Sequence, residues 1–238
     1  MLLGDPIVFL IGSIFLIPAV LVAAPVHELG HAVAAVLMGD PSPRNRGYLR
    51  LDPRPFYERY GVVAAFVVNV TWGSRVPVNE YRLTGTGRKL VYALGGPAAN
   101  LVVAAVFGVL VRVLMGPGAF PDVATFAQPP LGYVATIVYA IYFLNLSTFA
   151  FQLLPVPGLD GWRVAEALFR NRNPRFFFNV AEKRQTIWLV AAGVIFLAPL
   201  LLRFSVLNAV VGIFFQPASS AILGSCTGYV VLDPCPLR

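Results

Sequence analysis

Long stretches without any charged side chain constrain the fold of this chain more than any other feature. Leu90 to Val111 and Leu131 to Leu154 contain none, and each exceeds the roughly twenty residues that a helix needs to cross a bilayer. Hydrophobic residues make up 58% of the chain and charged residues 12%, which excludes an ordinary soluble domain. The sequence therefore predicts an all-α polytopic membrane protein with about five or six transmembrane or re-entrant segments.

The first apolar run, Ile7 to Met38, contains the polar motif His27-Glu28-Leu29-Gly30-His31, which holds the only two histidines of the chain. Residues four apart share a helix face, so both imidazoles can bind one Zn²⁺. Glu28, about 100° round the helix, then reaches a water on the metal. The alternative is a chance match, or histidines that only bond to neighbouring helices. Ionisable side chains in lipid cost on the order of 3 kcal/mol each, which favours a zinc site, with one ion per chain.

Basic segments flank a short apolar stretch in the first half of the chain. Asp40 to Tyr60 contains five arginines, and Arg75 follows closely after the twelve residues from Gly61 to Trp72. Twelve residues span only about 18 Å as a helix, short of the roughly 30 Å hydrocarbon core, which favours a re-entrant segment. Both basic segments are then expected on the cytoplasmic side. Arg46 to Leu51 alternates polar and apolar residues, which predicts a small β-hairpin at that face.

The segments after residue 154 are harder to place. Trp162 to Phe169 predicts an amphipathic helix that lies in the membrane interface or packs on the bundle. Ile187 to Leu202 predicts a further crossing, and Phe204 to Gly224 is either another span or an interfacial helix. That choice decides whether Cys226 and Cys235 are free thiols in the cytoplasm or face an oxidising compartment where a disulfide forms. We expect a transmembrane catalytic core over residues 1–202, and a C-terminal amphipathic or spanning helix with a tail over residues 203–238.

The net charge and the lengths of the apolar segments and gaps limit the classes of protein to which this chain can belong. The net charge is +7, but the basic residues lie in a few loops beside apolar segments, which fits membrane orientation rather than nucleic-acid binding. The first apolar run is longer than the core of a signal peptide and is expected to remain in the mature protein. No gap between the apolar segments is long enough for an added soluble domain.

Two further polar residues stand beside helix-breaking sequences. A catalytic zinc usually has three protein ligands and leaves its fourth position to water. Asp160 follows the sequence LLPVPGL, whose prolines and glycine end a helix and present a carboxylate; an ordinary helix-ending aspartate is the alternative. Asn100 ends the sequence GGPAAN and lies roughly 15 Å into the membrane, close to the depth of the histidines. It either lines the site or only bonds to another helix.

Three motifs, HELGH at 27–31, GGPAAN at 95–100 and LLPVPGLDG at 153–161, resemble the site-2 protease family of intramembrane zinc metalloproteases in order and spacing. GDP at 39–41 and WGSRVPVN at 72–79 extend the resemblance. It implies that His27, His31 and Asp160 bind zinc and that Glu28 is the catalytic acid and base. Asn100 and Gln152 are the candidates for substrate or oxyanion contact, and family members usually have asparagine where this chain has Gln152.

The resemblance also implies the activity. The chain is expected to hydrolyse peptide bonds in or near transmembrane segments of membrane proteins, as in regulated intramembrane proteolysis. We expect a multi-pass protein of a prokaryotic cell membrane with its active site toward the cytoplasm. Its expected partners are a transmembrane protein substrate and the lipid bilayer, without nucleic acid. The strand at Tyr48 to Leu51 either clamps an unwound substrate as an added edge strand or has only a structural role.

Two other classes of protein are open alternatives. A non-catalytic zinc-dependent scaffold has no need of Glu28 beside a zinc that carries water. A metal transporter would be expected to show polar residues that continue across the membrane, and beyond this cluster the main apolar segments show few.

Overall fold

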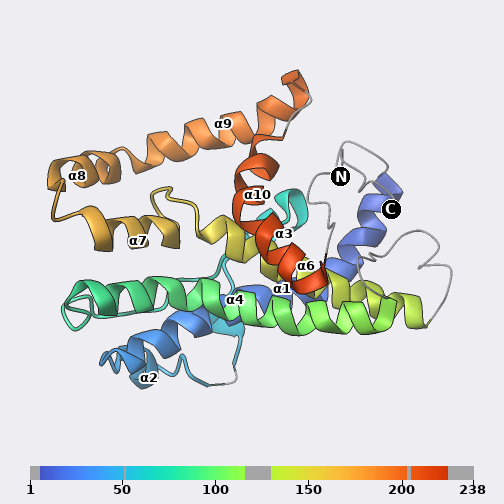
Figure 1. Cartoon of the computed structure of the whole chain (residues 1–238), viewed down its shortest axis with the longest axis horizontal. Coiled ribbons are helices and arrows are strands. Elements are labelled where there is room, and N and C mark those ends of the chain that lie inside the picture. The colour runs from blue at the N-terminus through green and yellow to red at the C-terminus, as the bar shows by residue number, and fades with distance from the viewer. Residues whose placement is uncertain (1–5, 51, 116–129, 203–204, 225–238) are drawn as a thin grey trace.

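A computed structural model describes residues 6–50, 52–115, 130–202 and 205–224, and its regular structure there is helical (Figure 1). Four segments are long and apolar enough to cross a membrane: Gly12–Leu37, Thr86–Met115, Leu131–Gln152 and Val206–Gly224. This confirms the predicted all-α membrane class. In chain order the helices are α1 (Pro6–Leu37), α2 (Ser42–Asn45), η1 (Arg54–Phe56), α3 (Arg59–Val68), α4 (Thr86–Met115), α6 (Leu131–Gln152), α7 (Asp160–Phe169), α8 (Pro174–Glu182), α9 (Arg184–Leu202), α10 (Val206–Ser219) and η2 (Ser220–Gly224).

Helices α1, α4 and α6 pack on one another and form the centre of the bundle. Backbone meets backbone where α1 crosses α4. A Cβ added at Gly95 would lie 2.7 Å from the carbonyl oxygen of Gly30 and 2.7 Å from the Cβ of Ala34, so only glycine fits there. Small residues are how membrane helices approach this closely. Since His31 follows Gly30 in the chain, the crossing also fixes the position of the histidines against α4.

Helix α3 is the short apolar segment between the basic stretches. It begins after Glu58, whose Oε2 accepts a 2.8 Å hydrogen bond from the Gly61 N–H. It ends at Asn69, which has the left-handed φ of 57°. Ten residues rise only about 15 Å, too short to cross the hydrocarbon core. The chain then returns as an irregular segment to the start of α4, as the prediction of a non-spanning segment requires.

The predicted β-hairpin is wrong, since the described residues of this region form no strand. Residues 42–45 form α2 and residues 46–49 continue in turns. Asp40 starts this helix by accepting hydrogen bonds from the backbone N–H and the hydroxyl of Ser42 at 3.0 and 2.6 Å. Gly47 then has φ +79°, which reverses the chain where the strand was expected. Both alternatives for Tyr48 to Leu51, a substrate clamp and a structural hairpin, therefore have no strand to form them, and Leu51 lies outside the described residues.

One ladder contact does occur nearby, as an isolated antiparallel bridge between Tyr57 and Gly73. In it, the Ser74 N–H donates to the carbonyl oxygen of Phe56 at 2.8 Å. This bridge holds the segment after α3 against the segment before it.

In the C-terminal third, α7 and α8 lie toward one end of the bundle and α10 packs on α6 (Figure 1). Helix α7 contains the predicted amphipathic segment, and Trp162 packs on Phe177 of α8 with ring centroids 5.1 Å apart. Helix α10 continues through η2 as an apolar segment of 19 residues, a length that favours the spanning alternative. Its residues Val211 and Phe215 share the main apolar core with Tyr142 of α6. Cys226 and Cys235 lie outside the described residues, and with them the choice between free thiols and a disulfide.

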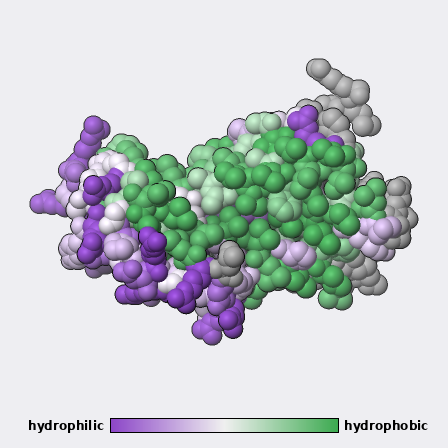
Figure 2. All heavy atoms as spheres, turned by 90° about the horizontal axis from the view of Figure 1, so that it is seen from below, coloured by the Kyte–Doolittle hydropathy of each residue, from purple (hydrophilic) through white to green (hydrophobic). Residues whose placement is uncertain are grey.

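The surface divides along the long axis of the molecule. Figure 2 shows hydrophilic residues gathered at one end and hydrophobic residues over the middle of the visible face. Figure 1 places α2, α7 and the start of α4 toward the same end. The apolar middle is the part that fits the hydrocarbon of a bilayer.

Candidate metal centre

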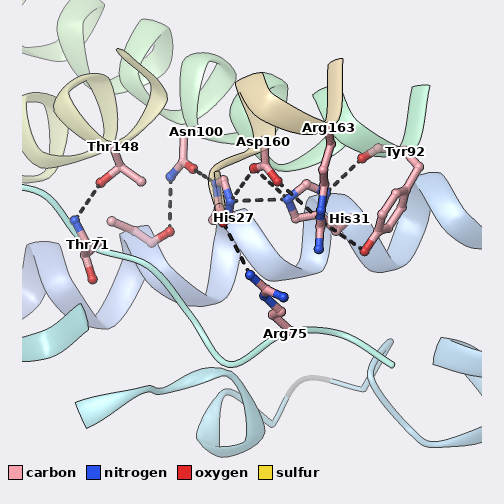
Figure 3. Close-up of polar contacts among 11 residues, drawn as sticks. His27, His31, Thr71, Arg75, Tyr92, Asn100, Thr148, Asp160 and Arg163 are labelled. Carbon is pink, nitrogen blue, oxygen red and sulfur yellow. Dashed lines mark hydrogen bonds and ion pairs between the residues drawn. The ribbon is translucent and has the colours of Figure 1, made fainter. Parts of the chain in front are cut away.

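Two elements bring three ligand side chains together. His27 and His31 come from one face of α1, and Asp160 is the first residue of α7 (Figure 3). The Oδ2 of Asp160 lies 3.0 Å from the Nε2 of His27 and 2.9 Å from the Nε2 of His31. The two Nε2 atoms are 3.2 Å apart. All three residues are buried.

This arrangement fits a zinc ion. Zinc bonds of about 2.0–2.2 Å at tetrahedral angles place ligand atoms roughly 3.3–3.5 Å apart, close to the spacing of the three atoms here. Two imidazoles and one carboxylate also form a donor set typical of catalytic zinc, which leaves one position open. Asp160, His27 and His31 are, among the described residues, the group of three that can hold a metal ion.

A buried amide network orients His27. The Nδ1 of His27 lies 2.7 Å from the Oδ1 of Asn100. The Nδ2 of Asn100 donates to the Oδ1 of Asn145 at 2.8 Å and to the carbonyl oxygen of Ala23 at 3.1 Å. Because Oδ1 accepts from Nδ1–H, the Nε2 of His27 is left without a proton and free for a metal. Asn100 is fully buried, so the structure supports a positioning role, and its predicted contact with substrate stays a prediction.

His31 and Asp160 have matching supports. The Nδ1 of His31 donates to the carbonyl oxygen of Tyr92 at 2.8 Å, which again leaves Nε2 for the metal. The Oδ1 of Asp160 faces the Nη1 of Arg163 at 3.4 Å, so its two oxygens have different partners. Burial raises the pKa of Asp160. When protons rather than zinc occupy the two Nε2 atoms, the charge of His31 and the hydrogen bonds from His27 and His31 outweigh that burial and hold the pKa of Asp160 well below its usual range.

Two glycines make room for the site. A Cβ at Gly96 would collide with the Nε2 of His31 and lie 2.7 Å from the Cε1 of His27. A Cβ at Gly73 would collide with the Cγ of Glu28 and lie 2.9 Å from its Oε1. Gly96 therefore leaves space for the imidazoles, and Gly73 lets the irregular segment after α3 pass directly against Glu28.

A cavity of about 620 Å³ opens over this centre. Glu28 and Gln152 line it together with the three ligands, so the structure places Gln152 at the wall of the cavity. The Asn predicted for the site, Asn100, stands behind His27 and is not among the lining residues. The remaining described lining residues are Glu58, Tyr60, Trp72, Gly73, Ser74, Arg75, Val76, Tyr92, Phe151, Gly158, Leu159, Arg163, Arg184 and Trp188.

Sequence reasoning missed three residues of the site. Asn145 is an amide within a long uncharged run, the same signal that identified Asn100. Arg163 follows Asp160 by three residues on a helix, a spacing that brings two side chains together. Tyr92 gave no signal, because its backbone carbonyl makes the bond to His31.

Several curated proteins are similar to this chain. YwhC of Bacillus subtilis is 31% identical over 159 residues, which cover 65% of this chain and 68% of YwhC. Rip2 of Mycobacterium tuberculosis is 31% identical over 192 residues, which cover 76% of this chain and 66% of Rip2. Rip2 of Mycolicibacterium smegmatis is 28% identical over 197 residues, covering 80% and 70%. All three are provisionally named zinc metalloproteases.

The other comparisons gave no match. No family model matches the chain. No solved structure matches it significantly. The motifs, the three assembled ligands and the relatives agree, and the chain belongs to the site-2 protease family of zinc metalloproteases.

Proposed function

We propose that this protein is an intramembrane zinc endopeptidase that cleaves membrane-protein substrates in or near their transmembrane segments. One observation carries the proposal: the carboxylate of Glu28 lines the same cavity as His27, His31 and Asp160, on a helix that is long and apolar enough to cross a membrane. A binding or transport site needs the three ligands, but it does not need a carboxylate beside them. Hydrolysis needs a group that moves protons.

The residues of the chain divide the chemistry between them. Zinc held by His27, His31 and Asp160 would supply Lewis acidity for the attacking water and for the peptide carbonyl. Glu28 takes the proton from the attacking water and later gives it to the leaving amine. Asn100 and the carbonyl oxygen of Tyr92 hold the two imidazoles in the orientation that binds metal.

The need to reach a metal inside this cavity limits which transmembrane segments can be substrates. A transmembrane helix protects its peptide bonds with its own hydrogen bonds and side chains, so a segment must unwind locally before a backbone carbonyl can reach the metal. Sequences that contain helix-breaking residues are therefore the expected substrates. The polar lining of the cavity gives the freed backbone groups partners that lipid lacks.

Loss of one proton acceptor tests this proposal. Wild type and Glu28→Gln are purified with zinc and incubated with a panel of transmembrane-segment reporters, and zinc content is measured in parallel. Glu28→Gln is expected to retain one zinc and to lose cleavage by at least about a hundredfold, the scale of general acid–base catalysis. Equal cleavage by both proteins contradicts the role of Glu28. If wild type binds zinc and cuts nothing, the protein is a zinc-dependent scaffold.

We also propose that the cavity faces the cytoplasm. The hydrophilic end of the molecule in Figure 2 supports this orientation, because cytoplasmic loops are rich in arginine. Arg172→Cys, with both native cysteines replaced by serine, is expected to react with an impermeant thiol reagent only in inverted vesicles. Reaction in right-side-out vesicles would reverse the topology.

A further inference from the structure

Three arginines from separate segments line the catalytic cavity. Arg75 comes from the irregular segment after α3, Arg163 from α7, and Arg184 from the start of α9. Arg163 has partners in the site: its Nη1 lies 3.4 Å from Asp160 Oδ1 and 3.3 Å from the Tyr92 hydroxyl. Arg75 and Arg184 lie at the exposed mouth. Metal binding and proton transfer, as proposed above, leave these two without a role.

Arg75 and Arg184 converge on Gly158. The Nη2 of Arg75 donates to the carbonyl oxygen of Gly158 at 3.4 Å, a long hydrogen bond (Figure 3). A Cβ built on Gly158 would lie 3.9 Å from the Arg75 Nη2 and 3.9 Å from the Arg184 Cδ. The two side chains thus border the same small space, two residues before Asp160. Neither makes an ion pair with any residue that the structure describes.

The described carboxylates of the cavity form no ion pair with Arg75 or Arg184. Asp160 faces the two histidines and Arg163, and Glu58 accepts from the Gly61 N–H at 2.8 Å and the Trp72 Nε1 at 3.1 Å. Glu28 stands beside the ligands as the proton carrier. Partial burial, and then the charges of Arg163 and Arg184, lower the pKa of Arg75, and together they outweigh the opposing charges of Tyr92 and Glu28. Arg75 therefore stands in a positive field that a bound zinc would strengthen.

We propose that Arg75 and Arg184 form a subsite for a carboxylate side chain, so that the enzyme prefers substrates with Asp or Glu beside the scissile bond. The inference rests on the proposed function, because the cavity over the metal ligands is where a peptide must lie. A guanidinium offers five N–H donors in a planar fork that matches a carboxylate, and Arg75 uses one of them on Gly158. A carboxylate at this place gains two cationic partners.

Binding to a non-cutting enzyme measures the subsite directly. The probe is a fluorescent peptide with one apolar spanning segment and a Gly-Pro break, with Glu, Gln or Lys scanned through the positions beside the break. Glu28→Gln is expected to bind the best-placed Glu peptide about fivefold more tightly than its Gln twin, near the upper range for exposed charge pairs. Added salt should reduce this ratio. In the triple variant that adds Arg75→Gln and Arg184→Gln to Glu28→Gln, the ratio of affinities for the Glu and Gln peptides is expected to fall to about one.

Matched variants keep the test specific. Arg172→Gln with Arg175→Gln removes the same charge from exposed positions outside the cavity and should keep the Glu preference. Arg75→Glu with Arg184→Glu should favour the Lys peptide. Equal binding of all three peptides at every scanned position overturns the subsite, as does a Glu preference that survives loss of both arginines.

Cleavage and lipid measurements separate the remaining outcomes. If wild type cuts the Glu and Gln peptides at equal kcat/KM, the subsite fails and the protease function stands. If wild type cuts neither while the binding preference holds, the protease function fails and the subsite stands. Vesicles of phosphatidylcholine with and without phosphatidylglycerol test a lipid headgroup. If loss of the arginines lowers affinity for the anionic vesicles and leaves peptide preference unchanged, the carboxylate subsite is refuted.

Discussion

Asn100 joins the metal centre to the rest of the bundle, and its removal should weaken zinc binding as well as the fold. Asn100→Ala deletes three hydrogen bonds: from His27 Nδ1, to the carbonyl oxygen of Ala23, and to the Oδ1 of Asn145. All three partners are held in a fully buried environment, where water does not replace the lost amide. His27 is then free to rotate and to take the other tautomer, with its proton on the nitrogen that binds metal.

The size of the effect follows from these contacts. Hydrogen bonds between membrane helices contribute about 0.6 kcal/mol each on average, so three account for roughly 2 kcal/mol of stability. Removal of a residue that orients a metal-binding histidine typically costs 10- to 100-fold in metal affinity, about 1.4–2.7 kcal/mol. We therefore expect Asn100→Ala to fold, to melt earlier than wild type, and to bind zinc at least about tenfold more weakly.

Competition with a chromophoric chelator measures the zinc affinity, and thermal unfolding with and without zinc measures the stability. Tyr142→Phe is the control, because it deletes a buried 2.7 Å contact with Ser219 away from the zinc ligands. It should lower the unfolding temperature and leave zinc affinity unchanged. A zinc affinity of Asn100→Ala within twofold of wild type would refute the reasoning.

Three other substitutions test separate parts of the site. Gly96→Ala should lower zinc affinity without removing any ligand, as the same chelator titration will show, because its Cβ collides with His31. Gly73→Ala should lower kcat and keep zinc content, because its Cβ displaces the Glu28 side chain. Asp40→Asn should destabilise the fold by about 1–3 kcal/mol, since Asp40 accepts hydrogen bonds from Ser42 and from the Asn79 N–H at 2.6 Å. Burial raises the pKa of Asp40, but these hydrogen bonds outweigh it and hold the pKa below its usual value. The stability that Asp40 contributes is therefore present above about pH 3.9 and is lost as the pH falls below that value. Unfolding curves of the two proteins should converge at the lower pH.

Some of the site could be predicted because it depends on spacing alone. Two histidines four residues apart must share a helix face, so their juxtaposition needed no tertiary structure. Asp160 could be proposed because helix-breaking residues precede it, and the structure shows why they are needed. Gly158 has φ +105°, and a Cβ at Gly161 would collide with the carbonyl oxygen of Leu153.

The rest depends on contacts that a sequence pattern does not contain. Alternating residues from Arg46 to Leu51 suggested a strand, but the hydrogen bonds from Ser42 to Asp40 at the start of α2 and the positive φ of Gly47 decided the local structure. The backbone bond from Tyr92 to His31 is independent of side-chain type. The sequence does not identify His27 as the partner of Asn100, because that pairing depends on the point along both helices at which α1 crosses α4.

The segment from residue 71 to residue 79 is hydrogen-bonded to three other parts of the chain at close intervals. The Thr71 hydroxyl donates to the carbonyl oxygen of Gly61, the Ser74 N–H to Phe56, and the Asn79 N–H to Asp40. Elsewhere on the wall of the cavity, Trp188 of α9 donates a hydrogen bond from its Nε1 to the carbonyl oxygen of Pro157. Among the described residues, α9 is otherwise held by apolar packing, which includes that of Trp188 and Ile195 on the main core, and we expect this packing to yield before three hydrogen bonds do. Any widening that admits a polypeptide should therefore occur by outward displacement of α9, with amide hydrogen exchange fast there and slow at Ser74 and Asn79.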